Sequence, residues 1–392
     1  MNSELVTIKR ALKIDFPKGQ SAFLWGPRKT GKTTYLLRRF PKSTRHDLLE
    51  TDTFFRLSKE PFLLRQEIQS LKDKGGLVEP VIIDEVQKIP TLLDEIHWLI
   101  EKLKISFVLC GSSARKLKRS HANLLGGRAW KFELFPLTTN ELGEDFDILT
   151  AINRGLVPSH YLDRNYQRTI KSYIGDYLKE EIRDEGLIRN LPAFARFLDA
   201  IPFSCGELVN YSNVAHDCGI DSKTVAEYYQ ILVDTLIGVF IEPFRKRKKR
   251  NTISSTPKFY LFDVGIAGGL MKRIIQTNKG VEFGNAFENF ILMELLAHRS
   301  YTEKDYRIDF WRTKGGKEVD FVLDGGRVAI EVKGTNKIKN DDLKGMVSFI
   351  EDHKPEQAFV VCQEPVQRRL PAGIEIIPWK TFLKMLWAGK VL

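Results

Sequence analysis

Short apolar runs in the N-terminal third of the chain end abruptly in polar or acidic residues. Residues 21–25, 80–83 and 105–110 have the character of buried strands, and a helix is expected to begin near Lys32. A buried strand of this kind reaches solvent only at the carboxyl edge of its sheet, where ligands bind in open α/β proteins. The pattern therefore predicts an α/β domain whose chemistry follows directly after these strands.

The middle of the chain shows helical periodicity. An amphipathic packing helix is expected within residues 166–186, with an apolar face made of Ile170, Tyr173, Ile174 and Tyr177. Residues 208–244 contain two shorter helices separated by a Gly-Ile-Asp-Ser turn, and Asp221 or Ser222 is the expected N-cap of the second. The apolar face of this second helix comprises Val225, Tyr229, Leu232 and Leu236. This arrangement is a helix-turn-helix pattern.

The C-terminal part combines one helix with a set of strands. The helix is expected within residues 282–299, and its apolar face comprises Phe287, Phe290, Ile291 and Leu295. Three strands separated by Gly pairs are expected within residues 306–334. Because side chains alternate along a strand, Glu331 and Lys333 point the same way, and Asp320 on the antiparallel neighbour can join them.

The length of 392 residues predicts roughly two to four units, and the apolar and charged fractions are those of a protein that folds throughout. The loop-like stretch at residues 156–163 separates the N-terminal part from the helical region. We therefore expect an α/β domain at residues 1–155, a largely helical domain at residues 156–262 and a second α/β domain at residues 263–392.

The net charge and the cysteine pattern limit which partners and which cellular compartment are expected. Lys and Arg exceed Asp and Glu by 61 − 50 = 11, so the summed field attracts polyanions such as nucleic acid, although a solvated basic face explains the same excess. The four cysteines form no Cys-x-x-Cys pair, and no apolar run approaches the ~20 residues of a spanning helix. We expect a cytoplasmic protein without a membrane span.

Residues 26–33 match the pattern G-x-x-x-x-G-K-[ST] between a predicted strand and a predicted helix, which indicates a P-loop. Gly26 and Gly31 let backbone N–H groups turn toward phosphate oxygens. Lys32 brings a positive charge to the β and γ phosphates, and the Thr33 hydroxyl is suited to Mg²⁺. ATP and Mg²⁺ are therefore the predicted cofactors. The predicted nucleotide-binding residues of this loop are Gly26, Pro27, Arg28, Lys29, Thr30, Gly31, Lys32, Thr33 and Thr34.

Polar residues after the next two strands complete a candidate ATPase site. Asp84 is predicted to hold Mg²⁺ and Glu85 to polarise the attacking water, because both follow a buried strand in a chain that has a P-loop. Ser112 or Ser113 is predicted to stand beside Asp84 and to sense the γ-phosphate, with a capped turn as the alternative. Arg128 precedes a further strand, where an arginine can act on the phosphate of a neighbouring subunit; a solvated arginine is the alternative.

These motifs carry a family resemblance. The stretches GPRKTGKTT, IIDEVQKIP, LCGSSARKL and LLGGRAWKFELFPLTTNEL, in this order, resemble the prokaryotic AAA+ ATPases that carry a C-terminal nuclease-like domain. The resemblance covers nearly the whole chain. It implies an AAA+ core, a helical middle and a restriction-endonuclease-like end, and it implies the role of arginine finger for Arg128. A homo-oligomer is consistent with that role.

The middle region predicts contact with DNA. The start of the second helix of a DNA-binding helix-turn-helix approaches the groove, which assigns Lys223 and Thr224 to the interface. Six consecutive cations then precede a predicted strand, as in the basic wing of a winged helix: Arg245, Lys246, Arg247, Lys248, Lys249 and Arg250. Such a run repels itself unless a polyanion is near. The alternatives are a solvated loop and a winged helix that serves packing alone.

The acids of the C-terminal strands predict a metal-dependent phosphodiester hydrolase. Asp320 and Glu331 are expected to bind Mg²⁺ or Mn²⁺, with Glu288 of the preceding helix completing the shell. Lys333 is expected to position or activate water. The spacing from Asp320 to Glu-x-Lys resembles the D…E-x-K core of restriction-endonuclease-like folds. A polar stripe on the solvent face of an edge hairpin is the alternative.

Two functions are compatible with these features. The first is an ATP-hydrolysing AAA+ protein that acts on DNA and carries a Mg²⁺-dependent nuclease domain. The second is a nucleotide-controlled switch that recruits a protein partner, with a C-terminal domain that does not cleave. Complete acids at the nucleotide site argue against a purely structural role.

Overall fold

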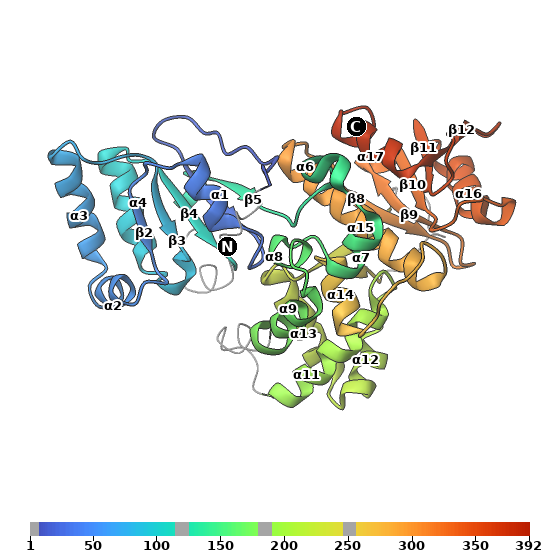
Figure 1. Cartoon of the computed structure of the whole chain (residues 1–392), viewed down its shortest axis with the longest axis horizontal. Coiled ribbons are helices and arrows are strands. Elements are labelled where there is room, and N and C mark those ends of the chain that lie inside the picture. Colours follow the sequence, from blue (N-terminus) through green and yellow to red (C-terminus); the bar gives the residue numbers. More distant parts are fainter. Residues whose placement is uncertain (1–7, 114–124, 179–189, 246–255) are drawn as a thin grey trace. The chain divides into compact units, whose positions relative to one another are not determined.

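The computed structural model describes residues 8–113, 125–178, 190–245 and 256–392 (Figure 1). The chain forms two compact units. The N-terminal unit comprises residues 10–135 together with 234–236, and the C-terminal unit comprises residues up to Lys9, 136–233 and 237–392. Each unit is described by itself below.

The N-terminal unit is built on a five-stranded parallel sheet with the order β2-β3-β4-β1-β5. The strands β1, β3 and β4 lie inside the sheet and are buried along their whole length, which explains their continuous apolar sequence. This confirms the predicted α/β domain. The strands are β1 (Ser21–Trp25), β2 (Arg45–Asp47), β3 (Val81–Asp84), β4 (Phe107–Gly111) and β5 (Ala129–Glu133).

Among the described residues of this unit, four α-helices connect the strands, and the apolar faces of the last three pack with β1, β3 and β4 into one core. They are α1 (Lys32–Arg39), α2 (Thr51–Lys59), α3 (Phe62–Asp73) and α4 (Leu92–Leu103). Short 3-10 turns occupy Val86–Lys88 and Leu125–Gly127.

The loop between β1 and α1 requires two glycines. Gly31 has a φ of 90°, a conformation that strains any residue with a Cβ, and α1 begins at the next residue. A Cβ on Gly26 would lie 2.5 Å from the carbonyl oxygen of Leu134, so only glycine allows this close approach. The predicted strand, loop and helix are therefore present, with the loop at the carboxyl end of the sheet.

The C-terminal unit contains a helical part in which residues of five described α-helices and a hairpin share one core. Asp221 caps α13 by accepting hydrogen bonds from the backbone N–H groups of Lys223 and Thr224, which confirms the predicted N-cap; the two predicted helices are α12 and α13. The helices of this part are α6 (Thr139–Leu142), α7 (Ile148–Arg154), α8 (Pro158–Tyr161), α9 (Tyr166–Ser172), α11 (Leu191–Ala200), α12 (Tyr211–Cys218), α13 (Ser222–Asp234) and α14 (Val264–Leu270).

Two local predictions in this region need correction. The stretch expected to be a loop, residues 156–163, contains the helical turn α8, because Pro158 occupies the first turn of a helix, where its missing N–H costs nothing. The expected single helix from residue 166 changes to π-helical geometry over residues 173–178. Residues 179–189 of that prediction lie outside the described residues.

An eight-stranded mixed sheet organises the rest of the C-terminal unit, with the order β12-β13-β11-β10-β9-β8-β6-β7. The three predicted strands are β8, β9 and β10. The strands are β6 (Gly238–Pro243), β7 (Lys258–Leu261), β8 (Ile308–Arg312), β9 (Glu318–Leu323), β10 (Val328–Val332), β11 (Gln357–Cys362), β12 (Arg368–Arg369) and β13 (Ile374–Pro378). The long predicted helix is α15 (Val281–Tyr301), and α16 (Lys344–His353) and α17 (Trp379–Trp387) follow later. α15 packs against β10 and α17, and α16 packs against β9.

The sheet does not stop at the predicted boundary between residues 262 and 263. β6 pairs with β7 and also runs parallel to β8, so the hairpin of the middle region extends the C-terminal sheet. The compact units are accordingly two, and the division into three domains stays a prediction. Within the described parts of the chain, no helix is both long enough and apolar enough to cross a membrane.

Candidate functional site

The P-loop encloses the side chain of Lys32. Its ammonium donates hydrogen bonds to the carbonyl oxygens of Gly26 at 2.8 Å and Pro27 at 3.0 Å, and the residue is 6% exposed. The hydroxyl of Thr30 also donates to the Pro27 carbonyl, at 2.8 Å. Predicted loop residues that face solvent are Arg28, Lys29, Thr33 and Thr34. The ammonium thus lies within the loop whose backbone amides are expected to bind phosphate.

The two predicted Mg²⁺ ligands of the nucleotide site lie together. The hydroxyl of Thr33 donates a hydrogen bond of 2.7 Å to Oδ2 of Asp84, which is 1% exposed at the end of β3. The backbone N–H of Glu85 donates to the other carboxylate oxygen at 3.1 Å. A hydroxyl and a carboxylate oxygen are hard ligands of the kind that Mg²⁺ prefers. The donor set therefore fits the predicted ion.

Glu85 is connected to Ser112 through a residue that the sequence analysis missed. The amide Nε2 of Gln87 donates to Oε2 of Glu85 at 2.5 Å and to Oγ of Ser112 at 3.2 Å. Gln87 is 5% exposed, and a Cβ on Gly111 would lie 2.3 Å from its Oε1, so the glycine makes room for it. Ser113 is fully buried beside Ser112. The candidate base and the candidate sensor thus share one buried amide.

Arg10 is a second residue of this site that the sequence analysis missed. Its guanidinium donates hydrogen bonds to the carbonyl oxygens of Thr30, at 2.7 Å, and Phe135, at 2.5 Å. Both hydrogen bonds join parts of the chain that are far apart in sequence. Arg10 therefore ties the start of the chain to the P-loop and to the segment after β5.

Arg128 lies at the other end of the sheet. Its carbonyl accepts a hydrogen bond from the N–H of Ser21 at the first residue of β1, whereas the P-loop follows the last residue of that strand. Its guanidinium pairs with Glu101 of α4 and lowers the pKa of that carboxyl. The five residues of β1 span roughly 17 Å, so Arg128 cannot serve the phosphate site of its own sheet. The predicted action on a neighbouring subunit is compatible with this position and stays a prediction.

The C-terminal acids meet on β9 and β10. The antiparallel register ends with Phe321 opposite Ile330, and Asp320 and Glu331 are the next residues of the two strands. Oδ2 of Asp320 accepts a hydrogen bond of 2.7 Å from the N–H of Val332. Asp320 is 7% exposed and Glu331 5%, so the two acids are not the solvent-facing stripe considered as the alternative.

Burial and mutual repulsion hold these acids toward their neutral forms. Burial raises the pKa of Asp320 well above its usual value, and the charges of Glu331 and Glu288 raise it further. Burial also raises the pKa of Glu331 to about 7, although Lys333 lowers it. Lys333 pairs with Oε1 of Glu331 at 2.6 Å, so the two side chains lie on the same side of the chain. Burial lowers the pKa of Lys333, but the charges of Glu331 and Asp320 outweigh it and the pKa is raised.

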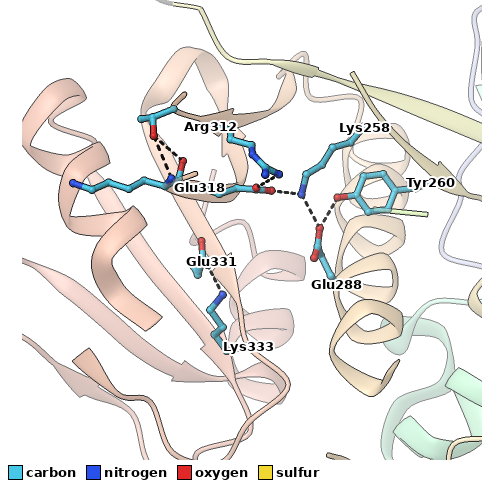
Figure 2. A network of polar contacts seen from close by, with 9 residues as sticks. Lys258, Tyr260, Glu288, Arg312, Glu318, Glu331 and Lys333 are labelled. Atoms are coloured by element: carbon cyan, nitrogen blue, oxygen red, sulfur yellow. Dashed lines mark hydrogen bonds and ion pairs between the residues drawn. The ribbon is translucent and has the colours of Figure 1, made fainter. Parts of the chain in front are cut away.

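Two further residues of this site lie on β7, and no motif in the sequence indicated that they belong to it (Figure 2). Lys258, 3% exposed, contacts Oε1 of Glu288 at 3.4 Å and also pairs with Glu318. The hydroxyl of Tyr260 donates to the same Oε1 of Glu288 at 2.5 Å. We call the four carboxylates Glu288, Glu318, Asp320 and Glu331 with Lys258, Tyr260 and Lys333 the acidic cluster.

The expected three-acid metal shell is not assembled in this conformation. Among the residues that the structure describes, no group of three or more His, Cys, Asp or Glu side chains is placed to hold a metal ion. The physical reason is local, because Lys258 and Tyr260 take one oxygen of Glu288 and Lys333 takes one oxygen of Glu331. Oε2 of Glu331 is nevertheless buried without a hydrogen-bond partner, and carboxylate oxygens suit Mg²⁺ or Mn²⁺. The donor chemistry fits the ion.

The predicted DNA-binding residues are only partly described. Lys223 is exposed in the first turn of α13, whereas the Thr224 hydroxyl donates to Oδ2 of Asp221 at 2.6 Å and so takes part in the helix cap. Arg245 is exposed after β6. Lys246, Arg247, Lys248, Lys249 and Arg250 lie outside the described residues.

Three family models match successive parts of the chain. An AAA domain matches residues 18–143, a domain of unknown function (DUF8612) matches residues 146–276, and another (DUF4143) matches residues 283–382. The first match covers the P-loop and the acids of the parallel sheet. Together with the P-loop geometry, this match identifies the N-terminal unit as an AAA-type ATPase domain that binds nucleotide.

Relatives over most of the chain are themselves uncharacterized. The chain is 23% identical to a Haemophilus influenzae protein over 331 residues, which is 76% of this chain and 78% of the relative. It is 22% identical to a Methanocaldococcus jannaschii protein over 384 residues, 88% of this chain and 82% of the relative. Among solved structures it resembles a Walker-type ATPase of Pyrococcus abyssi, with 16% identity, a TM-score of 0.42, and coverage of 64% of this chain and 90% of the other. Another is the Aeropyrum pernix ORC1 protein in complex with DNA, with 13% identity, a TM-score of 0.29, and coverage of 64% and 86%.

Proposed function

We propose that the protein hydrolyses ATP at the P-loop and acts on DNA, which its C-terminal unit cleaves in a Mg²⁺-dependent reaction. The observation that carries the proposal is the pair of buried acids Asp320 and Glu331 on adjacent strands, with partly exposed Lys333 beside Glu331, in the same chain as an AAA-type nucleotide site. Neither part alone distinguishes a DNA-acting ATPase from other AAA+ proteins. Their combination favours it.

In the ATPase reaction each side chain has a separate task. Mg²⁺, when bound, neutralises charge on the β and γ phosphates. Thr33 and Asp84 would hold it, and Lys32 would leave the loop carbonyls to contact phosphate oxygens. Glu85 orients the attacking water and accepts its proton, while Gln87 fixes the Glu85 carboxylate relative to Ser112. We infer that Ser112 reports the presence of the γ-phosphate through this amide.

In the phosphodiester reaction the acidic cluster supplies the protein groups. The divalent cation, when bound, polarises the phosphate and lowers the pKa of water. Asp320 and Glu331 would hold it, and the carbonyl of Val332 could add a ligand. Lys333 positions the water and offsets negative charge on the phosphate.

Contact with DNA is proposed through the helical part. The order α11, α12, α13, β6 and β7, with bridges from Cys205 to Phe259 and from Leu208 to Lys258, supports a winged helix. Exposed Lys223 and Arg245, and the cations that follow in the sequence, are the groups proposed to meet phosphates. The net charge of +11 supports a polyanionic partner.

The test is cleavage of plasmid and single-stranded DNA by the purified full chain in Mg²⁺ or Mn²⁺, with and without ATP. Asp320→Ala should lose cleavage while keeping DNA binding and ATP hydrolysis. Lys32→Ala shows whether ATP controls the cleavage. Lys317→Ala, an exposed lysine three residues before Asp320, is the matched control. Equal cleavage by wild type and Asp320→Ala removes the nuclease assignment.

The second candidate function is a nucleotide-controlled switch that recruits a protein partner. The observation in its favour is that Lys258 and Lys333 already pair with acids of the cluster, as a site that does not cleave would allow. It predicts ATP turnover that is indifferent to DNA, and intact DNA in the cleavage test.

A further inference from the structure

Lys258 is a buried lysine of the C-terminal unit. It is the first residue of β7 and retains 3% exposure. An ammonium group in such a place is stable only if negative charge compensates for its lost hydration. Its position therefore has to be explained by the carboxylates around it.

The contacts of Lys258 lie on two different elements. Its Nζ is 3.4 Å from Oε1 of Glu288 on α15 and pairs with Glu318 on β9. The charge of Asp320 also raises its pKa. One ammonium thus joins Glu288 on the helix to Glu318 on the sheet, as Figure 2 shows.

Formal charges indicate that the cluster is left with a deficit. With all four acids ionised, the form that binds a cation, Glu288, Glu318, Asp320 and Glu331 carry −4, and the paired cations Lys258, Lys333 and Arg312 carry +3, which leaves −1. Without a bound cation, burial and repulsion relieve this deficit by holding Asp320 and Glu331 toward their neutral forms. A divalent cation in place of the Lys258 ammonium would change this sum to −4 + 2 + 2 = 0. The exchange removes the remaining charge.

Two observations indicate which contacts of the acidic cluster remain if the Lys258 ammonium leaves it. Glu318 has a second partner in Arg312 at 2.9 Å, and Glu288 keeps the Tyr260 hydroxyl, so neither acid depends on Lys258 alone. Oε2 of Glu331, a residue with 5% exposure, lies in the cluster without a hydrogen-bond partner. This oxygen is an acceptor that the side chains of the described structure leave unused.

We propose that the ammonium of Lys258 and a divalent cation of the Mg²⁺ or Mn²⁺ class exchange in the acidic cluster, so that binding of one excludes the other. Lys258 is then a built-in competitor that holds the acids together when no cation is bound. The proposal rests on the proposed metal site and deepens it, because it names the residue that sets the affinity of the site for its ion.

The experiment is Mn²⁺ titration of the nucleotide-free full chain, followed by the loss of the free Mn²⁺ signal in electron paramagnetic resonance. All proteins carry Asp84→Asn, which removes the carboxylate proposed to hold Mg²⁺ at the nucleotide site. Lys258→Met should bind Mn²⁺ at least about tenfold more tightly than the parent, because the competing charge is gone. Lys258→Arg keeps the charge and is the matched control, with parental affinity expected.

A third variant locates the binding. Lys258→Met with Asp320→Asn should lose the gain in affinity. If Lys258→Met binds no more tightly than the parent, or if its gain persists when Asp320 is replaced, the exchange is wrong. DNA cleavage that requires Asp320 can survive that result, so failure of this inference is distinct from failure of the proposed nuclease.

Chemical modification covers the case in which Lys258→Met does not fold. Acetylation of the parent by acetic anhydride, read out at each lysine by mass spectrometry, should be slow at Lys258 and faster when Mn²⁺ is bound. The exposed Lys18 should react equally in both conditions. Unchanged protection of Lys258 at a saturating concentration of Mn²⁺ would contradict the proposal.

Discussion

The nucleotide site and the acidic cluster both place carboxylates on strands of a sheet, but they neutralise them differently. Asp84 is buried with two uncharged donors, the Thr33 hydroxyl and the Glu85 backbone amide. In the acidic cluster, Lys258 and Lys333 contact carboxylates directly. The nearest lysine of the P-loop, Lys32, binds backbone carbonyls instead.

This difference teaches how each site is prepared for a cation. A hydroxyl or an amide gives way to Mg²⁺ without a change in charge, so the nucleotide site is ready for an ion that arrives with phosphate. A lysine that pairs with a carboxylate either leaves with its positive charge when an ion binds or stays and repels the ion. The acidic cluster is therefore the site whose occupancy the protein itself opposes.

The largest expected effect is a loss of activity at the nucleotide site. Lys32→Met should lower ATP hydrolysis by on the order of 100-fold or more, because the buried ammonium is the group placed to meet the β and γ phosphates. Steady-state release of phosphate measures it, with Lys18→Met, an exposed lysine outside the loop, as control. Near-parental hydrolysis by Lys32→Met would show that catalysis does not use the P-loop.

The next prediction concerns another buried carboxylate, that of Glu294, which accepts hydrogen bonds from uncharged donors. Glu294 accepts hydrogen bonds from the Thr139 N–H at 2.7 Å, the Thr139 hydroxyl at 3.0 Å and the Trp387 indole at 2.8 Å. Burial, with a smaller contribution from the charge of Glu141, raises its pKa from 4.5 to about 7 despite these hydrogen bonds. The folded state thus holds a proton that the unfolded chain releases.

The stability from this proton is complete below pH 4.5 and is lost as the pH rises through about 7, by up to ~3 kcal/mol. Urea unfolding of the wild type between pH 5 and 8 measures the loss, and Glu294→Gln should flatten it. Buried His298, one turn further along α15, has its pKa lowered to about 4 by burial, which opposes the trend at the acid end. The difference between wild type and Glu294→Gln isolates Glu294, and identical pH profiles would contradict the prediction.

A smaller effect sharpens the description of the nucleotide site. Gln87→Ala should reduce kcat for ATP hydrolysis roughly tenfold with little change in nucleotide affinity, because the amide positions Glu85 without contacting nucleotide in this arrangement. The side chain of Gln87→Asn is one methylene too short to make both contacts. Its kcat should therefore lie between those of the wild type and Gln87→Ala. A rise in KM with an unchanged kcat would assign Gln87 to binding instead.

The smallest effect tests the acidic cluster without any ligand. Asp320→Asn should leave the free energy of unfolding within about 1 kcal/mol of the wild type or increase it, because a buried acid beside two others gives way to a neutral group of the same shape. Urea unfolding at pH 7 in EDTA measures this. A loss of several kcal/mol would mean that the charge of Asp320 stabilises the fold, in contrast to the role proposed for it.

Local patterns predicted the parts of these sites that are contiguous in sequence. The P-loop, the acids after β3 and the Glu-x-Lys strand each lie within a few residues, and backbone geometry alone brings their side chains together. Asp320 was also predictable, because antiparallel strands separated by a short turn fix which residues oppose each other. The capped start of α13 followed from the preference of Asp for N-caps.

Residues that act through tertiary contact were not predictable in this way. Arg10 reaches Phe135 across 125 positions, and Lys258 meets Glu288 across 30, with no spacing rule to indicate either contact. Gln87 lies next to predicted residues, yet its role depends on the space that Gly111 leaves. Pro158 was taken as a loop signal, although proline also begins helices and here does so.

The pairing of β6 with β8 has a practical consequence for taking the protein apart. A fragment that begins at residue 263 would lack β6 and β7, so the backbone of β8 would become an open sheet edge that invites aggregation. The same cut would remove Lys258 and Tyr260 from the acids that they contact. An inactive or insoluble fragment would then reflect the place of the cut and would say nothing about the chemistry of the acids.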